Sequence, residues 1–308
     1  MKKKISIVTP TFNEEKNIEK LCSLISIEMS KLDYDYEHIV IDNLSTDSTI
    51  PILRKIAAND KNLKVIINSR NFGHIKSPVH GILQASGDAV VYMNSDFQDP
   101  ISLISIYLKE WASGHKVVMA QKISADEGTK MNFVRRAYYR IMKLISEIPL
   151  VENTTGSGLF DRKIVEEIRN IKDPYPYLRG LISEITTEIK LIPFHQPKRE
   201  EGKTKNNFYT LYDIGVLGII KHSKLPLRII TFIGFVASIL SFLVAIVYFF
   251  RKILEWDRFD AGIAPLFIGF FLIASLQIFL LGFIGEYVMH ILTQIRNVQV
   301  VEKERINF

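Results

Sequence analysis

Cysteine is almost absent from this chain of 308 residues, and the common phosphate-binding motifs are missing too. The single cysteine, Cys22, excludes an internal disulfide framework, so nothing indicates an oxidising compartment. No Gly-x-Gly-x-x-Gly follows the first predicted strand and no complete P-loop is present, which argues against a dinucleotide site and a Walker-type site. The stretch Thr-Gly-Ser-Gly at 155–158 is a weak glycine signal.

The chain carries a moderate excess of positive charge. Lysine and arginine total 39 against 33 acidic residues, giving a net charge of +6 and a pI near 9.1. This balance suits an anionic partner such as a nucleotide, a phosphate or a lipid head group, and charge alone does not choose among them. The basic start is followed by an apolar run that stops at Val8 and Pro10, so it predicts a strand and not a signal peptide.

Two long apolar runs lie in the last third of the chain. Residues 227–250 carry one charge, Arg228, and residues 263–281 carry none. Each approaches the length of about 20 residues that spans a hydrocarbon core of roughly 30 Å. They predict a transmembrane hairpin within residues 227–289, with a polar loop at 251–261. Two buried core helices are the alternative, but such helices seldom hold more than about 14 fully apolar residues.

The segments that flank the hairpin are amphipathic or basic. Within residues 207–226 one helical face would hold Phe208, Leu211, Tyr212, Gly215 and Ile219, which fits an interfacial helix on a bilayer or an ordinary amphipathic core helix. More lysine and arginine lie in the flanks than in the loop, which favours both termini inside. Residues 290–308 are expected to form a cytoplasmic tail.

The first part of the chain, residues 1–206, has the pattern of an α/β domain. Short runs rich in isoleucine and valine begin near residues 4, 36, 63, 87 and 115, and helical patterns separate most of them. Asn13 is a plausible N-cap of the first helix. Continuous apolar strands that alternate with helices predict a mostly parallel sheet covered on both faces.

Polar residues follow the strands where each is expected to end. They occupy 9–13, 42–47, 68–71 and 94–98. Ligands of such sheets bind beyond the carboxyl ends of the strands. Carboxylates and amides suit a nucleotide whose diphosphate is held through a metal, and magnesium often takes only one or two protein oxygens besides substrate phosphates. Asp96 and Gln98 can supply these.

Seven segments in order resemble a family 2 glycosyltransferase of the polyprenyl-phosphate type, a group that includes dolichol-phosphate mannose synthases and bacterial undecaprenyl-phosphate glucosyltransferases. The segments are VTPTFNEEKNI, IVIDNLSTDST, SRNFGH, GDAVVYMNSDFQDP, TGSGLFDRKIVE, REEGKTKNNF and GFIGEYV. The resemblance runs over nearly the whole chain. It implies a GT-A (Rossmann-like) α/β fold with a mostly parallel sheet, followed by interfacial helices and the two-helix transmembrane hairpin.

The resemblance also implies roles for individual residues. Asp96 matches the catalytic carboxylate, and Asp96 with Gln98 would hold Mg²⁺ or Mn²⁺. The expected nucleotide-sugar contacts are Pro10, Thr11, Phe12, Glu14, Asp42, Asn43, Arg70, Asn94 and Asp96. The expected acceptor-phosphate contacts are Lys122, Arg135, Arg136, Arg199 and Lys205, and for any one of these a solvated surface charge is the competing interpretation.

Asn94 departs from the family pattern, which usually reads Asp-x-Asp-x-Gln. An amide there removes about one negative charge but keeps an oxygen ligand, so we expect weaker metal affinity with retained activity. A degenerate, inactive site is the competing interpretation. Asp99 precedes Pro100 and is expected to be an N-cap.

The implied reaction is inverting transfer of a hexose, with UDP-glucose first among donors, to undecaprenyl (polyprenyl) phosphate at the cytoplasmic face of a bacterial inner membrane, for cell-envelope or O-antigen glycans. A lipid monophosphate has a second pKa near 6 and needs no general base. His74, His80 and His195 are therefore expected to be structural or to contact substrate. The partners are the nucleotide sugar, the lipid and the membrane, with no nucleic acid, and a homo-oligomer is compatible with the sequence.

Two other functional classes stay open. A processive polysaccharide synthase would share the GT-A domain, but such enzymes usually carry Gln-x-x-Arg-Trp, and neither Trp111 nor Trp256 has that context. A membrane scaffold with a degenerate nucleotide site is the second.

Overall fold

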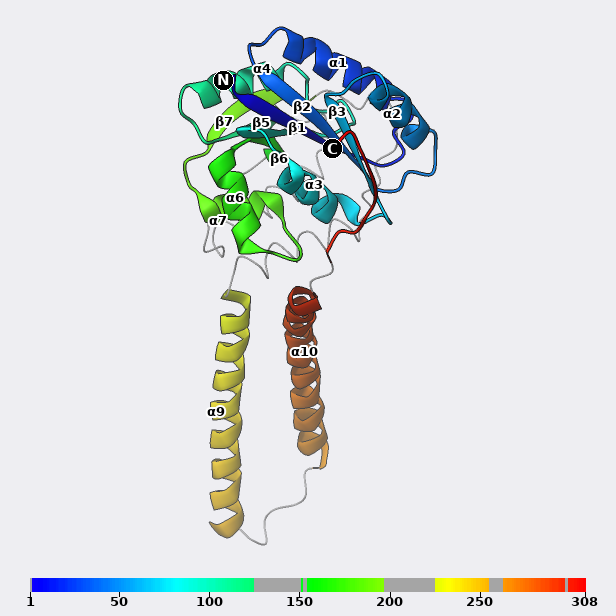
Figure 1. Ribbon diagram of the computed structural model, residues 1–308. Coiled ribbons are helices and arrows are strands. Elements are labelled where there is room, and N and C mark those ends of the chain that lie inside the picture. The colour runs from blue at the N-terminus through cyan, green and yellow to red at the C-terminus, as the bar shows by residue number, and fades with distance from the viewer. Residues whose placement is uncertain (1, 125–150, 152–153, 197–224, 255–262, 297–298) are drawn as a thin grey trace.

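The computed structural model describes residues 2–124, 151, 154–196, 225–254, 263–296 and 299–308. Within these residues a single mixed sheet forms the centre of the first domain (Figure 1). Its strand order is β7-β5-β6-β4-β1-β2-β3-β8. The strands are β1 (Lys4–Thr11), β2 (Asp35–Asp42), β3 (Leu63–Asn68), β4 (Ala89–Tyr92), β5 (Val117–Ser124), β6 (Thr154–Asp161), β7 (Lys190–His195) and β8 (Glu302–Ile306).

The sheet is mostly parallel, as the sequence predicts. Strands β1, β2, β3 and β4 pair in parallel, and β5 pairs in parallel with β7. Strand β6 runs antiparallel between β4 and β5, and β8 runs antiparallel to β3. A Cβ atom at Gly158 would lie 2.4 Å from the carbonyl oxygen of Val118, so β6 approaches β5 closely because residue 158 has no side chain.

Helices cover both faces of the sheet. Residues of α1, α2 and α4 share one apolar cluster with the strands, which includes Ile25, Leu53 and Tyr107. Residues of α3, α6 and α7 form the second cluster on the other face, with Val79 and Ile182. The helices are α1 (Ile18–Ser30), α2 (Thr49–Ala57), α3 (Gly73–Gln84), α4 (Leu103–Ala112), α6 (Arg162–Ile171) and α7 (Leu178–Ile185).

The chain returns to the sheet at its end. Residues 302–306 form β8, whereas the sequence predicts only a tail over 290–308. His80 Nε2 lies 2.6 Å from Glu302 Oε1, so this histidine has a structural partner. The Asn307 side chain donates to the carbonyl oxygens of Ala57 (2.7 Å) and Leu63 (2.9 Å). The charged sequence Glu-Lys-Glu-Arg-Ile therefore covers an edge that β3 would otherwise leave open.

Two long helices complete the described chain. Figure 1 shows α9 (Leu225–Leu254) and α10 (Ile263–Arg296) extending away from the sheet domain. Over the positions that the structure describes, no helix combines the length and the apolar character needed to cross a membrane. The predicted transmembrane hairpin is therefore not confirmed at these positions.

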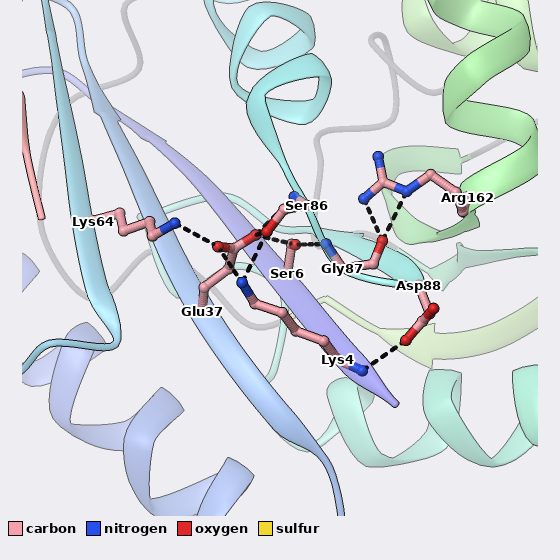
Figure 2. A network of polar contacts seen from close by, with 8 residues as sticks. All are labelled: Lys4, Ser6, Glu37, Lys64, Ser86, Gly87, Asp88 and Arg162. Atoms are coloured by element: carbon pink, nitrogen blue, oxygen red, sulfur yellow. Dashed lines mark hydrogen bonds and ion pairs between the residues drawn. The ribbon is translucent and has the colours of Figure 1, made fainter. Parts of the chain in front are cut away.

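A polar network ties together the edge of the sheet where the parallel strands begin, called the amino edge below (Figure 2). Glu37 lies at its centre and is 2% exposed. Its carboxylate accepts hydrogen bonds from Ser6 Oγ (2.6 Å), Lys4 Nζ (2.9 Å) and the Ser86 backbone amide (2.8 Å), and it pairs with Lys64 Nζ (2.9 Å). The network joins β1, β2, β3 and the segment before β4.

Burial alone would raise the pKa of Glu37. The hydrogen bonds from Ser6, Lys4 and Lys64 outweigh burial and hold that pKa well below its usual range. Nearby, Arg162 donates to the Gly87 carbonyl oxygen, with 2.8 Å from Nε, and so joins α6 to the same edge (Figure 2). At the amino edge the buried Glu37 carboxylate and the Gly87 carbonyl oxygen therefore both have hydrogen-bond donors.

Candidate active site

The opposite edge, where the parallel strands end, is called the carboxyl edge. Thr11 pairs with Asp42 and Asp42 with Ile67, while Val8 pairs with Tyr92 in β4. This register brings the ends of β1, β2, β3 and β4 together. The structure therefore gathers the predicted nucleotide segments, from 10–14, 42–43, 68–71 and 94–98, at one edge, as the sequence predicts.

The loop after β1 is fastened to the loop after β2. Asn13 has a left-handed backbone with φ of 56°. Its amide nitrogen donates to Ser45 Oγ (2.8 Å), and its side-chain oxygen accepts from the Thr46 amide (2.8 Å). The prediction that Asn13 caps the first helix is wrong, because α1 begins at Ile18 after a turn, and the Asn13 side chain reaches across to the second loop.

Pro10, Thr11, Phe12 and Glu14 lie along this first segment. Pro10 and Thr11 end β1, and Thr11 is 3% exposed with no hydrogen-bond partner for Oγ1 among the described residues. The Glu14 carboxylate accepts from Asn17 Nδ2 at 2.8 Å, and its amide donates to Thr49 Oγ1 at 2.9 Å. A buried hydroxyl without a partner is costly unless a ligand or water meets it.

Asp42 is fully buried at the end of β2. Its two oxygens accept from the Ser45 amide (2.7 Å) and from Ser45 Oγ (2.5 Å). Burial raises the pKa of Asp42, against the opposing effect of the Ser45 hydrogen bonds. The two hydrogen bonds from Ser45 therefore fix the orientation of the Asp42 carboxylate at the carboxyl edge.

Asn43 and Asn68 form a buried amide pair beside it. Asn68 Nδ2 donates to Asn43 Oδ1 (3.0 Å) and to Ser77 Oγ (3.1 Å). The Phe72 amide donates to the same Asn43 oxygen (3.3 Å). Asn68 is 0% exposed, and its Oδ1 has no partner among the described residues. Asn68 was not among the predicted site residues, although it stands in the predicted segment 68–71.

Arg70 is exposed on the turn that leads into α3. Its guanidinium carbon lies 4.2 Å from the centroid of the Phe72 ring. Gly73 follows with φ of 82°, a conformation that glycine adopts without strain. The stack holds the Arg70 charge close to the amino-terminal end of α3.

The loop after β4 holds the predicted metal ligands. Tyr92 donates its hydroxyl to Asn94 Oδ1 at 3.0 Å, and Asn94 Nδ2 donates to Asp99 Oδ2 at 3.2 Å. Asp96 is half-buried and accepts from the Gln98 amide at 3.2 Å. Phe97 between them has φ of 56°. The Asn94 amide therefore bridges a hydroxyl and a carboxylate, a role that a second carboxylate could not fill.

Asp99 is a buried acid and not a helix cap. Helix α4 begins at Leu103 with Ser102 at its N-cap, because Pro100 and Ile101 form a turn first, so the predicted capping role is wrong. Asp99 is 1% exposed, and its Oδ1 has no partner among the described residues. Burial raises the pKa of Asp99 to about 6, and the nearby charge of Asp96 adds to the rise.

These side chains suit a divalent cation. Within the described residues, no group of at least three histidine, cysteine or acidic side chains converges. The side chains of Asp96, Gln98 and the buried, underpartnered Asp99 nevertheless supply hard oxygen atoms within one loop. A magnesium-type ion that takes most of its ligands from substrate phosphates and water needs no more protein oxygens than these.

The acceptor side is described only in part. Lys122 lies near the carboxyl end of β5, opposite Phe194 of β7. Arg135, Arg136, Arg199 and Lys205 lie outside the described residues. Arg179 at the start of α7 also lies near the carboxyl edge, and sequence reasoning missed it because α7 lies in none of the seven segments that carry the resemblance.

The structure is an α/β domain whose polar residues gather at the carboxyl edge, and comparison with known proteins identifies its class. Residues 6–169 match glycosyl transferase family 2, and the chain belongs to that family. It is a glycosyltransferase. Its fold also resembles that of glucosyl-3-phosphoglycerate synthase from Mycobacterium tuberculosis, at a TM-score of 0.50 and 18% identity over 71% of this chain and 78% of that one.

Relatives match over almost the full length. An uncharacterized glycosyltransferase of Synechocystis, sll0501, is 29% identical over 95% of this chain and 92% of its own. A prophage-derived bactoprenol glucosyl transferase of Shigella flexneri is 28% identical over 96% and 95%. A prophage bactoprenol glucosyl transferase homolog of Escherichia coli is 28% identical over 92% and 93%.

Proposed function

We propose that the enzyme transfers a hexose, from UDP-glucose first among donors, to undecaprenyl or another polyprenyl phosphate. The observation that carries the proposal is the carboxyl edge, which includes the half-buried Asp96 and where buried polar atoms of Thr11, Asn68 and Asp99 lack partners among the described residues. Relatives named bactoprenol glucosyl transferase, matched over nearly the whole chain, support the lipid acceptor.

The donor nucleotide would lie across the ends of β1, β2 and β3. Asp42 and the Asn43–Asn68 pair offer fixed acceptors and donors to a base or ribose, and Thr11 Oγ1 offers a further polar contact. Arg70, held over Phe72, brings positive charge to the same side. The predicted contacts Pro10, Phe12 and Glu14 line the first segment of this edge.

A divalent cation, Mg²⁺ or Mn²⁺, would be held by Asp96 and Gln98, with Asp99 beside them. Bound there, it would offset charge on the leaving diphosphate. The Asn94 side-chain amide donates to Asp99 and so fixes its orientation. In this proposal Asp96 binds the ion, and Asn94 orients a neighbouring carboxyl group without binding the ion itself. This arrangement favours an active site over a degenerate one.

The displacement does not require a general base. A phosphate oxygen of the lipid attacks the anomeric carbon, the bond from that carbon to the β-phosphate oxygen breaks, and UDP leaves with the electron pair. The sugar inverts at that carbon. Because the lipid phosphate is already anionic near neutral pH, the protein's contribution is to position it and to offset charge.

The acceptor would approach from a membrane. Helices α9 and α10 hold many large apolar side chains that are exposed, for example Phe232 at 67% and Ile278 at 70%. Their sequence, the basic flanks and the lipid acceptor support a membrane hairpin over 227–289, with the catalytic domain on the cytoplasmic face of a bacterial inner membrane. Lys122, Arg135, Arg136, Arg199 and Lys205 are the proposed phosphate contacts of the lipid.

A transfer assay tests the proposal directly. Membranes containing the full-length enzyme are incubated with UDP-[¹⁴C]glucose, undecaprenyl phosphate and MgCl₂, and the organic extract is counted. Label in the extract that depends on both lipid and cation supports the proposal. Label only in insoluble polymer would identify a processive synthase instead, and no label from any UDP- or GDP-hexose would favour a scaffold.

A further inference from the structure

Arg179 lies at the carboxyl edge although it follows the site motifs by many residues. It is half-buried in the first turn of α7, and its Nη2 donates to the Thr155 carbonyl oxygen at 3.4 Å. A Cβ atom built on Gly156 would lie 3.7 Å from Arg179 Nε and 3.8 Å from Tyr92 Cε1. Arg179 and Tyr92 therefore flank the same point on β6.

This point lies next to the loop that holds Asp96. Strand β6 runs antiparallel to β4, with Gly158 opposite Tyr92, so the first residues of β6 lie beside the chain that leaves β4. Tyr92 donates to Asn94, and Asn94 donates to Asp99. Through this chain of contacts the guanidinium group of Arg179 stands at the flank of the proposed metal loop.

The charges of neighbouring groups agree with that position. Burial raises the pKa of Tyr92 and of Asp99, and in both cases the Arg179 charge opposes the rise. Desolvation and the same charge lower the pKa of His74, near the start of α3. Arg179 is thus within electrostatic reach of the ends of β4, α3 and β6.

We propose that Arg179 binds a phosphoryl oxygen of the reacting substrates, an inference that rests on the proposed function. A guanidinium presents a planar fork of donors that fits phosphate, and it stays charged at every relevant pH. The phosphoryl oxygen can belong to the donor's diphosphate or to the acceptor lipid's phosphate. Both are anions that must lie near Asp96, so the position of Arg179 suits either.

The test uses the full-length enzyme with Arg179→Gln and Arg179→Lys. Steady-state transfer is measured with UDP-[¹⁴C]glucose varied at saturating undecaprenyl phosphate, and then with the lipid varied. Arg169→Gln is the matched control, because Arg169 is an exposed arginine of α6 that pairs with Glu166 and donates to the Leu83 carbonyl oxygen, away from the carboxyl edge. We expect the control to stay within about twofold of wild type.

For Arg179→Gln we expect kcat/KM to fall about 10- to 100-fold, which is the size of a lost hydrogen bond to a charged group. A rise in KM for UDP-glucose alone assigns the contact to the donor, and a rise in KM for the lipid alone assigns it to the acceptor. Arg179→Lys should recover part of the loss, because it keeps the charge but not the fork.

Kinetics within twofold of wild type in both variants would overturn the proposal. So would equal losses in Arg179→Gln and Arg179→Lys accompanied by equal falls in Tm, since that pattern describes a tether to Thr155. If the wild type forms no labelled lipid, the proposed function fails by itself. Calorimetric titrations with UDP and MgCl₂ and, separately, with undecaprenyl phosphate then decide: weaker binding of either ligand by Arg179→Gln supports the phosphate contact, and unchanged binding of both refutes it.

Discussion

Two buried carboxyl groups at opposite edges of one sheet have opposite surroundings. Glu37 at the amino edge and Asp99 at the carboxyl edge are 2% and 1% exposed. Glu37 receives donors from Ser6, Lys4, Lys64 and Ser86. Asp99 accepts from the Asn94 side-chain amide and has the Thr155 hydroxyl nearby, and its Oδ1 has no hydrogen-bond partner among the described residues. Similar burial thus accompanies very different degrees of hydrogen bonding.

The pKa values follow these surroundings. Hydrogen bonds overcome burial at Glu37 and lower its pKa, while burial prevails at Asp99 and raises its pKa to about 6. Perturbed acids with unmet polar atoms gather at functional sites, and fully paired ones also serve stability. The comparison teaches that the amino edge stabilises the fold and the carboxyl edge is arranged for a ligand.

The largest expected effect lies at the carboxyl edge. Asp96→Asn should lower the rate of sugar transfer about 10³-fold, because a ligand of the charge-offsetting cation is lost. Transfer of label from UDP-glucose to lipid measures this. Asp88→Asn is the matched control: Asp88 is an exposed acid at the amino edge that accepts from the Lys4 amide at 2.8 Å. Equal losses in the two variants would remove the distinction between the edges.

Glu37→Gln tests the amino edge. Removing the charge leaves Lys4 and Lys64 without their shared carboxylate, so the free energy of unfolding should fall by about 3 kcal/mol. Urea denaturation at neutral pH measures it. Glu304→Gln, whose ion pair with Arg54 is largely exposed, should cost less than about 0.5 kcal/mol. A changed KM for UDP-glucose in folded Glu37→Gln would contradict a purely stabilising role.

Asp99→Asn should stabilise the protein while lowering transfer. In metal-free buffer the folded pKa of about 6 exceeds the unfolded value near 4, so the native state binds more protons between them and loses stability as pH rises. The variant lacks this titration. The free energy of unfolding of Asp99→Asn should be about 2 kcal/mol larger than that of wild type at pH 7.5, and the two values should be equal near pH 4. A variant less stable at both pH values would show that Asp99 is satisfied.

The smallest expected effect is a loss of stability on substitution of Asn307, which directly follows β8. Asn307 has φ of 61°, and its side chain bonds carbonyl oxygens near the amino edge. Asn307→Gly keeps this conformation available and removes only the side-chain bonds, so it should lower stability by about 1 kcal/mol. Asn307→Ala adds the strain of a left-handed backbone and should lower it further. Unchanged stability in both variants would show that β8 does not hold the edge.

The sequence predicts much of the sheet and of its carboxyl edge. The apolar runs of β1 to β5 and the polar residues behind them predict the parallel core and the carboxyl edge, because buried strands and their ends have distinct compositions. Strand β6 is harder to predict, since its glycines read as a loop. Strand β8 begins with four consecutive charged residues, 302–305, and reads as a tail, although Glu304 pairs with Arg54 of α2 and Glu302 with His80 of α3.

The site divides in the same way. Asp42 and Asp96 carry local motifs and were predicted. The roles of Asn68, Asp99 and Arg179 depend on burial and on contacts between distant segments, which no local pattern encodes. Asn13 and Asp99 were both predicted as helix caps, and both side chains instead reach tertiary partners, Thr46 and Asn94. Tertiary contacts thus override local capping preference at this edge.

Calorimetric titration with UDP, in the presence and absence of MgCl₂, tests the central claim most directly, since it needs neither lipid nor transfer. Wild type and Glu37→Gln should bind UDP with matching affinity and with a clear dependence on the cation, whereas Asp96→Asn should lose that dependence. Cation-independent binding that is equal in all three proteins, or binding that Glu37→Gln weakens and Asp96→Asn does not, would contradict the account.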